Sequence, residues 1–304
     1  MKKSIWVLEN IKESADFYDE LTIIMLIASI CSWKRHNITF DELHCDSKTL
    51  QVLKEFNILH LWDNVDTSII DSFTSINKTT FWASAKVRVL LAQNECVSMI
   101  DTDFISYAPI YQIGQQYPVV YSHDEDGLQW YCGVDDPYIK KIKGLPTWLI
   151  HTPNQSALNV SYLSFNDIKL QMEYAKYSIN AMEELSLYDA PVGTHMVWAE
   201  QKILKQIITN KQIEYKTLIK NVFSCESKTF KEDLFNYSGE WTYKESLDKF
   251  YHIGFDKKEL RKDGSDLKFL YIICKDYIDT ESIKLILNKK NESDTCKLDS
   301  TLLS

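Results

Sequence analysis

The fold that the sequence predicts depends on one stretch, Val97-Ser98-Met99-Ile100-Asp101-Thr102-Asp103-Phe104-Ile105. A short apolar run without Pro or Gly ends in two acids separated by one residue, and apolar residues resume directly behind them. This pattern predicts a buried β-strand whose end delivers Asp101 and Asp103 to one place. In an open α/β sheet the ligand crevice lies outside the carboxyl ends of the strands. Two carboxylates this close repel each other, and a hard divalent cation with oxygen ligands relieves the repulsion.

Strands and helices alternate on both sides of this stretch. Upstream, the apolar pattern predicts strands at 4–8, 38–43 and 58–62, and helices at 14–34, 47–56 (with Ser47 as N-cap) and 81–91. Downstream it predicts a hairpin of 119–121 and 128–131 around the acidic turn 124–127, a strand at 157–165, and helices that begin near 168 and 195. The alternation is typical of a doubly wound sheet, and the added hairpin makes it a mixed α/β sheet flanked by helices.

Length and composition predict how the chain is divided. With 304 residues, of which 45% are hydrophobic and 25% charged, the chain is long enough for one large domain with a smaller helical part. We expect a ligand-binding and catalytic core at 1–210, a mainly helical C-terminal extension that completes the site at 211–288, and a flexible polar tail at 289–304.

Charge and cysteine content exclude several classes of function. The net charge of -9 and a pI near 5.3 argue against a general nucleic-acid binder, which needs a basic surface. The seven cysteines include no CxxC pair, so neither a zinc knuckle nor a disulfide framework is indicated. The apolar run 21–31 is too short to span a bilayer. These features predict a reduced, cytoplasmic protein without a transmembrane segment.

Two cations, Lys86 and Arg88, lie one short helix upstream of the acid pair. Each is either a solvated or snorkelling cation, or one of them turns toward the acids to bind a substrate oxygen or to pair with Asp101. The chain contains neither GxGxxG nor GxxxxGK, so a nucleotide would not be held by a glycine-rich loop. A carboxylate pair with a bridging cation can instead bind a diphosphate.

The residues from Trp82 to Arg88, followed by the stretch from Met99 to Phe104, resemble the Asp-x-Asp signature of GT-A fold glycosyltransferases. In that family a basic residue on the preceding helix and an Asp-x-Asp at a strand end hold a nucleotide-sugar and its Mn²⁺ or Mg²⁺. The resemblance therefore implies that Lys86 and Arg88 contact the donor, and that Asp101 and Asp103 bind the metal and act in catalysis. It also implies a GT-A-like fold.

Three later elements extend the resemblance. The strand around Asn159 is similar to the one that lines the donor-sugar and acceptor pocket in several such families. Glu200, which opens a helix, stands where these enzymes keep an acid that faces the acceptor. His252 and Lys257 resemble a late His-x-x-Gly-x-x-Lys element, here one residue shorter, in which His completes the metal shell and Lys binds the diphosphate.

The resemblance implies a metal-dependent transfer of a sugar from a nucleotide-diphosphate-sugar, expected to be a UDP-sugar, to an acceptor hydroxyl. We expect the acceptor to be a saccharide or lipid-linked saccharide of bacterial surface polysaccharide or glycolipid synthesis, met at the inner membrane face by peripheral contact. Glu200 would take the acceptor proton in an inverting reaction, and the departing phosphate would take it in a retaining one.

Two alternatives stay open. Phosphatases of the haloacid dehalogenase type also use Asp-x-Asp after a strand, but near the start of the domain and followed by Gly-Thr, whereas Phe104 and Ile105 follow here. A non-catalytic protein that binds a nucleotide-sugar would carry the same residues without turnover. The sequence leaves the base and sugar of the donor, the acceptor and the stereochemical outcome undecided.

Overall fold

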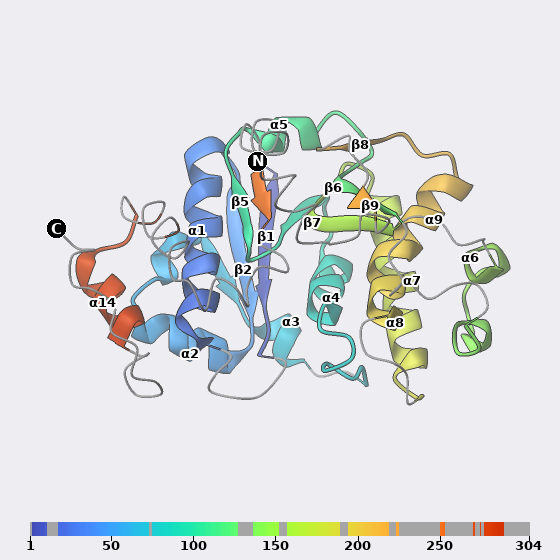
Figure 1. The fold of residues 1–304 in the computed structure, drawn as a ribbon, viewed down its shortest axis with the longest axis horizontal. Helices are drawn as coiled ribbons and strands as arrows, with labels where there is room; N and C mark the ends of the chain where they lie inside the picture. Colours follow the sequence, from blue (N-terminus) through green and yellow to red (C-terminus); the bar gives the residue numbers. More distant parts are fainter. Residues whose placement is uncertain are drawn as a thin grey trace.

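A mixed β-sheet with helices on both faces organises the chain (Figure 1). The computed structural model describes residues 2–10, 18–72, 75–126, 136–151, 157–188, 194–218, 223–224, 250–252, 270, 274 and 277–288. Within these residues the sheet has eight strands, in the order β3-β2-β1-β4-β7-β6-β8 with β9 beside β6. The predicted α/β class, a mixed sheet flanked by helices, is confirmed.

The strands of this sheet are β1 (Lys3–Leu8), β2 (Phe40–Cys45), β3 (Asn64–Asp66), β4 (Val97–Ile100), β6 (Val119–Asp126), β7 (Ala157–Phe165), β8 (Tyr215–Thr217) and β9 (Phe223–Ser224). β1 pairs in parallel with β2 on one side and with β4 on the other, whereas β7 runs antiparallel to both β4 and β6. From β1 the chain adds β2 and β3 on one side and then β4 on the other, so the strand order reverses between β1 and β4. A crevice at such a switch point, outside the carboxyl ends of the strands, is where an α/β sheet binds its ligand.

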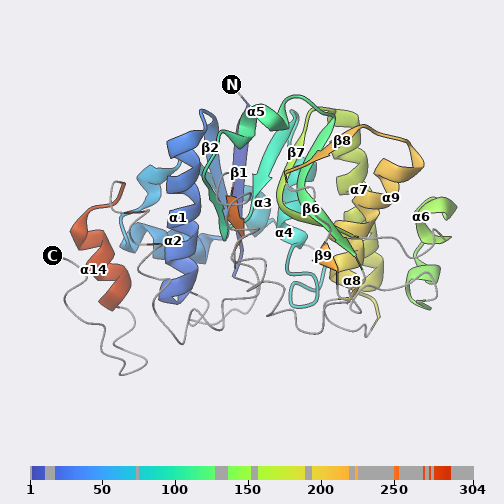
Figure 2. The same cartoon turned by 45° about the horizontal axis from the view of Figure 1, so that its top comes forward.

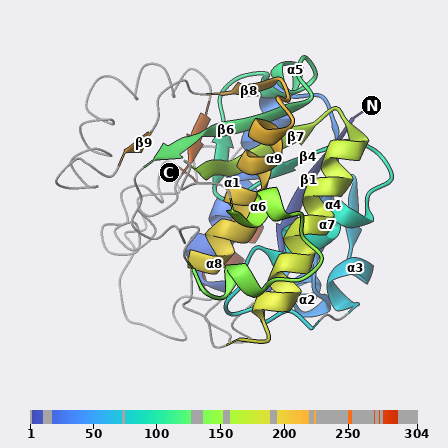
Figure 3. The same ribbon diagram turned by 90° about the vertical axis from the view of Figure 1, so that its right-hand side faces the viewer.

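The helices are α1 (Glu20–His36), α2 (Ser47–Glu55), α3 (Ser68–Asp71), α4 (Ser84–Ala92), α5 (Ile110–Gly114), α6 (Thr147–His151), α7 (Ile168–Leu185), α8 (Thr194–Val197), α9 (Ile203–Asn210) and α14 (Thr280–Asn288). α1 and α2 contribute to one apolar core, and α4, α7 and α9 to the other. Ile5 and Trp6, neighbours on β1, belong to different cores because successive side chains of a strand point to opposite faces. Figure 3 shows α7, α8 and α9 in front of the sheet on the second face.

The predicted strand at 58–62 is wrong. Leu59–Leu61 forms a short 3₁₀-helix, and the third parallel strand is Asn64–Asp66. Asn57, with a φ of 56°, lies in the left-handed region between the end of α2 and this turn. A short apolar run carries no periodicity that separates a strand from a buried turn, and here the turn forms.

Two helix starts also differ from the prediction. The N-cap of α2 is Asp46 rather than Ser47, because the Asp46 carboxylate accepts the backbone N–H of Thr49 at 2.9 Å. α1 begins at Glu20, after its N-cap Asp19, and residue 14, where we expected the helix to start, lies outside the described residues. Both caps are aspartates, which bind the free N–H groups of a first turn.

The first three residues of the predicted hairpin turn at 124–127 lie in a strand instead, and Gly127 lies outside the described residues. β6 runs on through Asp124, Glu125 and Asp126, and Glu125 pairs with Ala157 of β7. The second predicted hairpin strand, 128–131, lies outside the described residues. The bulge between Tyr121 and His123 shifts the register of β6 at this point.

The C-terminal part returns to the sheet at several places. β8 and β9 pair with β6, and a second sheet joins β10 (Phe250–His252) to β5 (Phe104–Ser106) in antiparallel fashion. The helix α14 lies beside α1 (Figure 1, Figure 2). The division into a core at 1–210 and an extension at 211–288 stays a prediction, and the predicted tail at 289–304 lies outside the described residues.

The apolar run in α1 is part of the interior of the protein. Its residues from Leu21 to Trp33 are buried, with the exception of Thr22, which is half-buried. Among the helices that the structure describes, none is long and apolar enough to cross a membrane. The described cysteines Cys31, Cys45, Cys96 and Cys274 are free thiols.

Asp41, buried on β2, predicts a pH dependence of stability. Burial raises the pKa of its carboxyl to about 6, although the Thr39 hydroxyl donates to it at 2.6 Å. The folded state therefore favours the protonated acid. This contribution to stability is fully present below the unfolded pKa of about 3.9 and is lost as the pH rises through about 6.

We expect Asp41→Asn to be more stable than the wild type at pH 8, by about 1–3 kcal/mol, since one pKa unit corresponds to about 1.4 kcal/mol. Near pH 4 the two proteins should have nearly equal free energies of unfolding, because the wild-type acid is protonated there. Urea unfolding at both pH values measures the difference. A stability difference that does not change with pH would contradict the prediction.

Candidate functional site

Asp101, Thr102 and Asp103 form a tight turn directly after β4. The Asp101 N–H donates to the Ser161 carbonyl of β7 at 2.8 Å, and the Phe104 N–H donates to the Asp101 carbonyl at 3.1 Å. The Asp101 side chain is 27% exposed, whereas Asp103 is only 4% exposed. The predicted strand end is thus present, and it carries both acids to the switch point between β1 and β4.

Lys86 lies in the first turn of α4 and points its ammonium at the strand end. Its Nζ lies 2.6 Å from Asp101 Oδ1 and 3.0 Å from Glu200 Oε1. Of the two interpretations of the upstream cations, the structure supports the one in which a cation turns inward and pairs with Asp101. Burial lowers the pKa of Lys86, but the Asp101 and Glu200 charges outweigh this effect and raise it above its ordinary value. Lys86 is therefore a fixed positive charge at any physiological pH.

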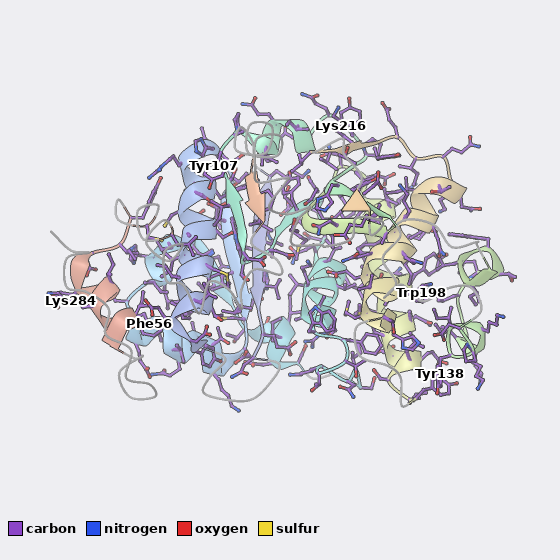
Figure 4. All side chains as sticks on the ribbon, viewed as in Figure 1. Phe56, Tyr107, Tyr138, Trp198, Lys216 and Lys284 are labelled. Carbon is purple, nitrogen blue, oxygen red and sulfur yellow. The ribbon has the colours of Figure 1, made fainter. Side chains whose placement is uncertain are left out.

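Glu200 reaches the site from an irregular helix. Residues Trp198–Lys202 form a π-helical segment between α8 and α9, and the Tyr174 hydroxyl of α7 donates to the Glu200 carbonyl at 2.9 Å. Figure 4 places Trp198, the first residue of this segment, among the helices on this face of the sheet. Such single-turn insertions are frequent at functional sites because they reorient side chains. We predicted Glu200 at a helix opening, and the structure places it in the π-helical segment that follows α8.

Burial and the Lys86 charge act in opposite directions on the pKa of the Glu200 carboxyl. Glu200 is 6% exposed, and burial raises the pKa of its carboxyl. Lys86 acts against this rise, and the charges of Asp101 and Glu125 add to it. An upward shift is the direction that general acid–base chemistry needs in a carboxyl.

The side chain of Arg88 points in a different direction from that of Lys86. Its Nη2 lies 3.2 Å from Glu9 Oε1, at the carboxyl end of β1, and Lys78 Nζ lies 2.7 Å from the same oxygen. The structure therefore brings Arg88 to the same edge of the sheet but pairs it with Glu9 rather than with Asp101. Its role in donor binding stays a prediction.

Asn159 on β7 is tied to two residues that the sequence analysis did not select. Its Nδ2 donates to Glu125 Oε1 at 2.8 Å, and His123 Nε2 lies 3.5 Å from the same oxygen. His123 and Glu125 are two residues apart on β6, so both point to one face of the sheet. That period-two spacing was the available signal, but we interpreted the acidic stretch as a turn.

The late element joins the site through its backbone. In the sheet of β5 and β10, His252 pairs with Phe104, the residue that follows Asp103. The side chain of His252 is not described, and Lys257 lies outside the described residues. The pairing places the backbone of the predicted third metal ligand beside the Asp-x-Asp turn.

The oxygen ligands at this strand end suit Mn²⁺ or Mg²⁺. Among the side chains that the structure describes, no group of three His, Cys, Asp or Glu residues gathers to hold a metal ion. Asp101 Oδ1 is engaged by Lys86, and the assignment of Asp103 as the firmer metal ligand stays a prediction. A metal here would need further oxygens, and the phosphates of a bound nucleotide are suitable donors.

The chain resembles three solved structures of sugar-transferring enzymes. The glycosyltransferase GlyE of Streptococcus pneumoniae TIGR4 is 12% identical over 96% of this chain and 64% of its own length, with a TM-score of 0.44. The galactosyltransferase LgtC, in complex with donor and acceptor sugar analogs, is 10% identical over 93% and 99%, with a TM-score of 0.47. Mouse xyloside xylosyltransferase 1 is 10% identical over 84% and 98%, with a TM-score of 0.42.

No protein-family model and no curated protein matches the chain. The chain spans just under two thirds of the length of the GlyE structure. At identities of 10–12% and TM-scores below 0.5, these similarities decide neither activity nor substrate. The case for a function of this protein therefore rests on its own site.

The pairing of Lys86 with two acids gives a stability prediction. Lys86→Met leaves the Asp101 and Glu200 carboxylates without their cation, and removing one partner of a largely buried pair is strongly destabilising. Because Asp101 is partly exposed, we expect a loss of about 2–4 kcal/mol in the free energy of unfolding, measured in urea at pH 7.

The double variant Lys86→Met with Glu200→Gln is the matched control. Gln removes one uncompensated charge, so the double variant should regain part of the lost stability and show a coupling energy in a double-mutant cycle. Lys86→Arg, which keeps the charge, should lose less than Lys86→Met. If the losses in unfolding free energy of the two single variants simply add, the pair of Lys86 and Glu200 contributes no coupling energy.

Proposed function

We propose that this protein is a metal-dependent glycosyltransferase that moves a sugar from a nucleotide-diphosphate-sugar, most simply a UDP-sugar, to an acceptor hydroxyl. One observation carries the proposal: an Asp-x-Asp turn at the carboxyl end of β4, at the switch point of the sheet, is joined to Lys86 and Glu200. Those residues come from three separate parts of the sequence, and they are among those that the resemblance to GT-A fold glycosyltransferases selected.

The donor diphosphate would be held on the acidic side of the site. Asp103, with Asp101 beside it and His252 on the neighbouring strand β10, would bind Mn²⁺ or Mg²⁺. When bound, the metal neutralises the phosphate oxygens that gain charge as the bond from sugar to phosphate breaks. Lys257 would add a positive charge to the same phosphates. The departing diphosphate thereby becomes a better leaving group.

The sugar would lie between β7 and the π-helical segment. Asn159 and Lys86 would donate hydrogen bonds to its hydroxyls, and Arg88 would complete the donor side near β1. Transfer passes through an oxocarbenium-like state, so holding the ring and the acceptor hydroxyl in line is a large part of catalysis. The ion pair of Lys86 with Asp101, at 2.6 Å, would hold the ammonium in that position before the substrate arrives.

Glu200 would face the acceptor. Its raised pKa suits a group that accepts a proton from the acceptor hydroxyl in an inverting reaction. In a retaining reaction the departing phosphate would take that proton, and Glu200 would keep the Lys86 ammonium in place. The expected acceptor is a saccharide or lipid-linked saccharide of bacterial surface polysaccharide or glycolipid synthesis, used on the cytoplasmic side with peripheral contact at the inner membrane face.

A phosphatase of the haloacid dehalogenase type is less well supported. Its Asp-x-Asp belongs at the start of the domain, whereas here the acids follow the β4 strand and lead directly into β5. A non-catalytic protein that binds a nucleotide-sugar remains the second candidate, since the same residues would bind the donor without turnover. Product formation separates these functions.

A panel of nucleotide-sugars, screened by thermal shift with and without Mn²⁺, tests the proposal. The correct donor should raise the melting temperature of the wild type only when Mn²⁺ is present. Asp103→Asn should abolish that metal-dependent shift and slow donor hydrolysis by about 100-fold, because it removes a charged ligand. The control Glu281→Gln removes an exposed acid on α14 and should behave as the wild type.

Metal-dependent hydrolysis that survives Asp103→Asn would rule out this assignment of the acid pair. Binding of a nucleotide-sugar without any hydrolysis or transfer would favour the non-catalytic protein. Hydrolysis of p-nitrophenyl phosphate that Asp103→Asn abolishes would favour the phosphatase.

A further inference from the structure

Two serines interrupt the apolar run of α1. Ser29 and Ser32 are 0% and 3% exposed, and both are surrounded by the apolar core of that face. They are three residues apart on the helix, so they lie on one side of it. A buried hydroxyl is unfavourable unless it is hydrogen-bonded, so the partners of these two serines explain why they are there.

Ser29 connects β1 to the acid pair. Its Oγ accepts the indole N–H of Trp6 at 2.9 Å and donates to the backbone carbonyl of Asp101 at 3.1 Å. The same carbonyl accepts the N–H of Phe104, which closes the Asp-x-Asp turn. Ser29 therefore holds the first residue of that turn from the face of the sheet opposite to Lys86.

Ser32 holds the other end of the same segment. Its Oγ accepts the backbone N–H of Ser106 at 3.0 Å and donates to the Ser29 carbonyl at 2.9 Å. Ser106 is the last residue of β5, the strand that pairs with β10 and so brings the backbone of His252 beside Phe104. The two serines thus fasten both ends of the main chain from Asp101 to Ser106 to one rigid helix.

We propose that Ser29 and Ser32 are positioning residues for the metal site at Asp101 and Asp103, an inference that rests on the proposed function. Neither serine touches a reacting group. They act by holding the backbone from which the two carboxylates project, and metal ligands must be held within about 0.5 Å of their working positions. Partners of this kind outside the metal shell typically change metal affinity by about 10- to 100-fold when they are removed.

The experiment measures the dissociation constant of Mn²⁺ from the full chain in the presence of UDP, by electron paramagnetic resonance of free Mn²⁺. Ser29→Ala and Ser32→Ala should each weaken Mn²⁺ binding about 10-fold. Ser4→Ala is the matched control, because Ser4 is also fully buried, on β1, and its hydroxyl has no hydrogen-bond partner within the described part of the chain. This control should bind Mn²⁺ as tightly as the wild type.

A second variant separates positioning from loss of stability. Trp6→Phe removes the indole donor to Ser29 but keeps the bond from Ser29 to Asp101, so it should lower the melting temperature with little change in Mn²⁺ affinity. The positioning role is overturned, while the proposed function stands, if Ser29→Ala and Ser32→Ala bind Mn²⁺ within threefold of the wild type. It is also overturned if Trp6→Phe weakens Mn²⁺ binding as much as the two serine variants do. A wild type that binds no Mn²⁺ overturns both.

Discussion

The site depends on one buried cation. The Lys86 ammonium lies 2.6 Å from an Asp101 oxygen and 3.0 Å from a Glu200 oxygen, and its removal from water is compensated by these two carboxylates. Because the acids come from the end of β4 and from the π-helical segment, the ammonium joins three separately formed elements. The site is therefore complete only when these three elements pack together.

Asp101 is the residue on which both faces of the sheet converge. Its N–H binds β7 through the Ser161 carbonyl, its carbonyl is held by Ser29 of α1, and its carboxylate is held by Lys86 of α4. A residue held at its backbone N–H, its carbonyl and its side chain cannot adjust independently to a ligand.

Part of this arrangement could be predicted from the residues alone. The apolar run that ends in two acids specified a buried strand, and Lys86 was one of two cations with the correct spacing to meet it. The strand at 58–62 and the hairpin turn at 124–127 were wrong for a shared reason. Short segments carry too little periodicity to separate strand from turn, and pairing partners elsewhere in the chain decide between them. Glu125 was missed because β7 makes it part of a strand.

The sequence by itself determined the chemistry that this protein can offer: two acids at a strand end, a nearby cation, and an acid in a later helix. Only the tertiary structure decided which of these groups meet. It turned Lys86 toward Asp101 and Arg88 toward Glu9, although the two cations are only two residues apart. The reason is geometric, since side chains two positions apart on a helix point in different directions and each pairs with the acid that the sheet places there.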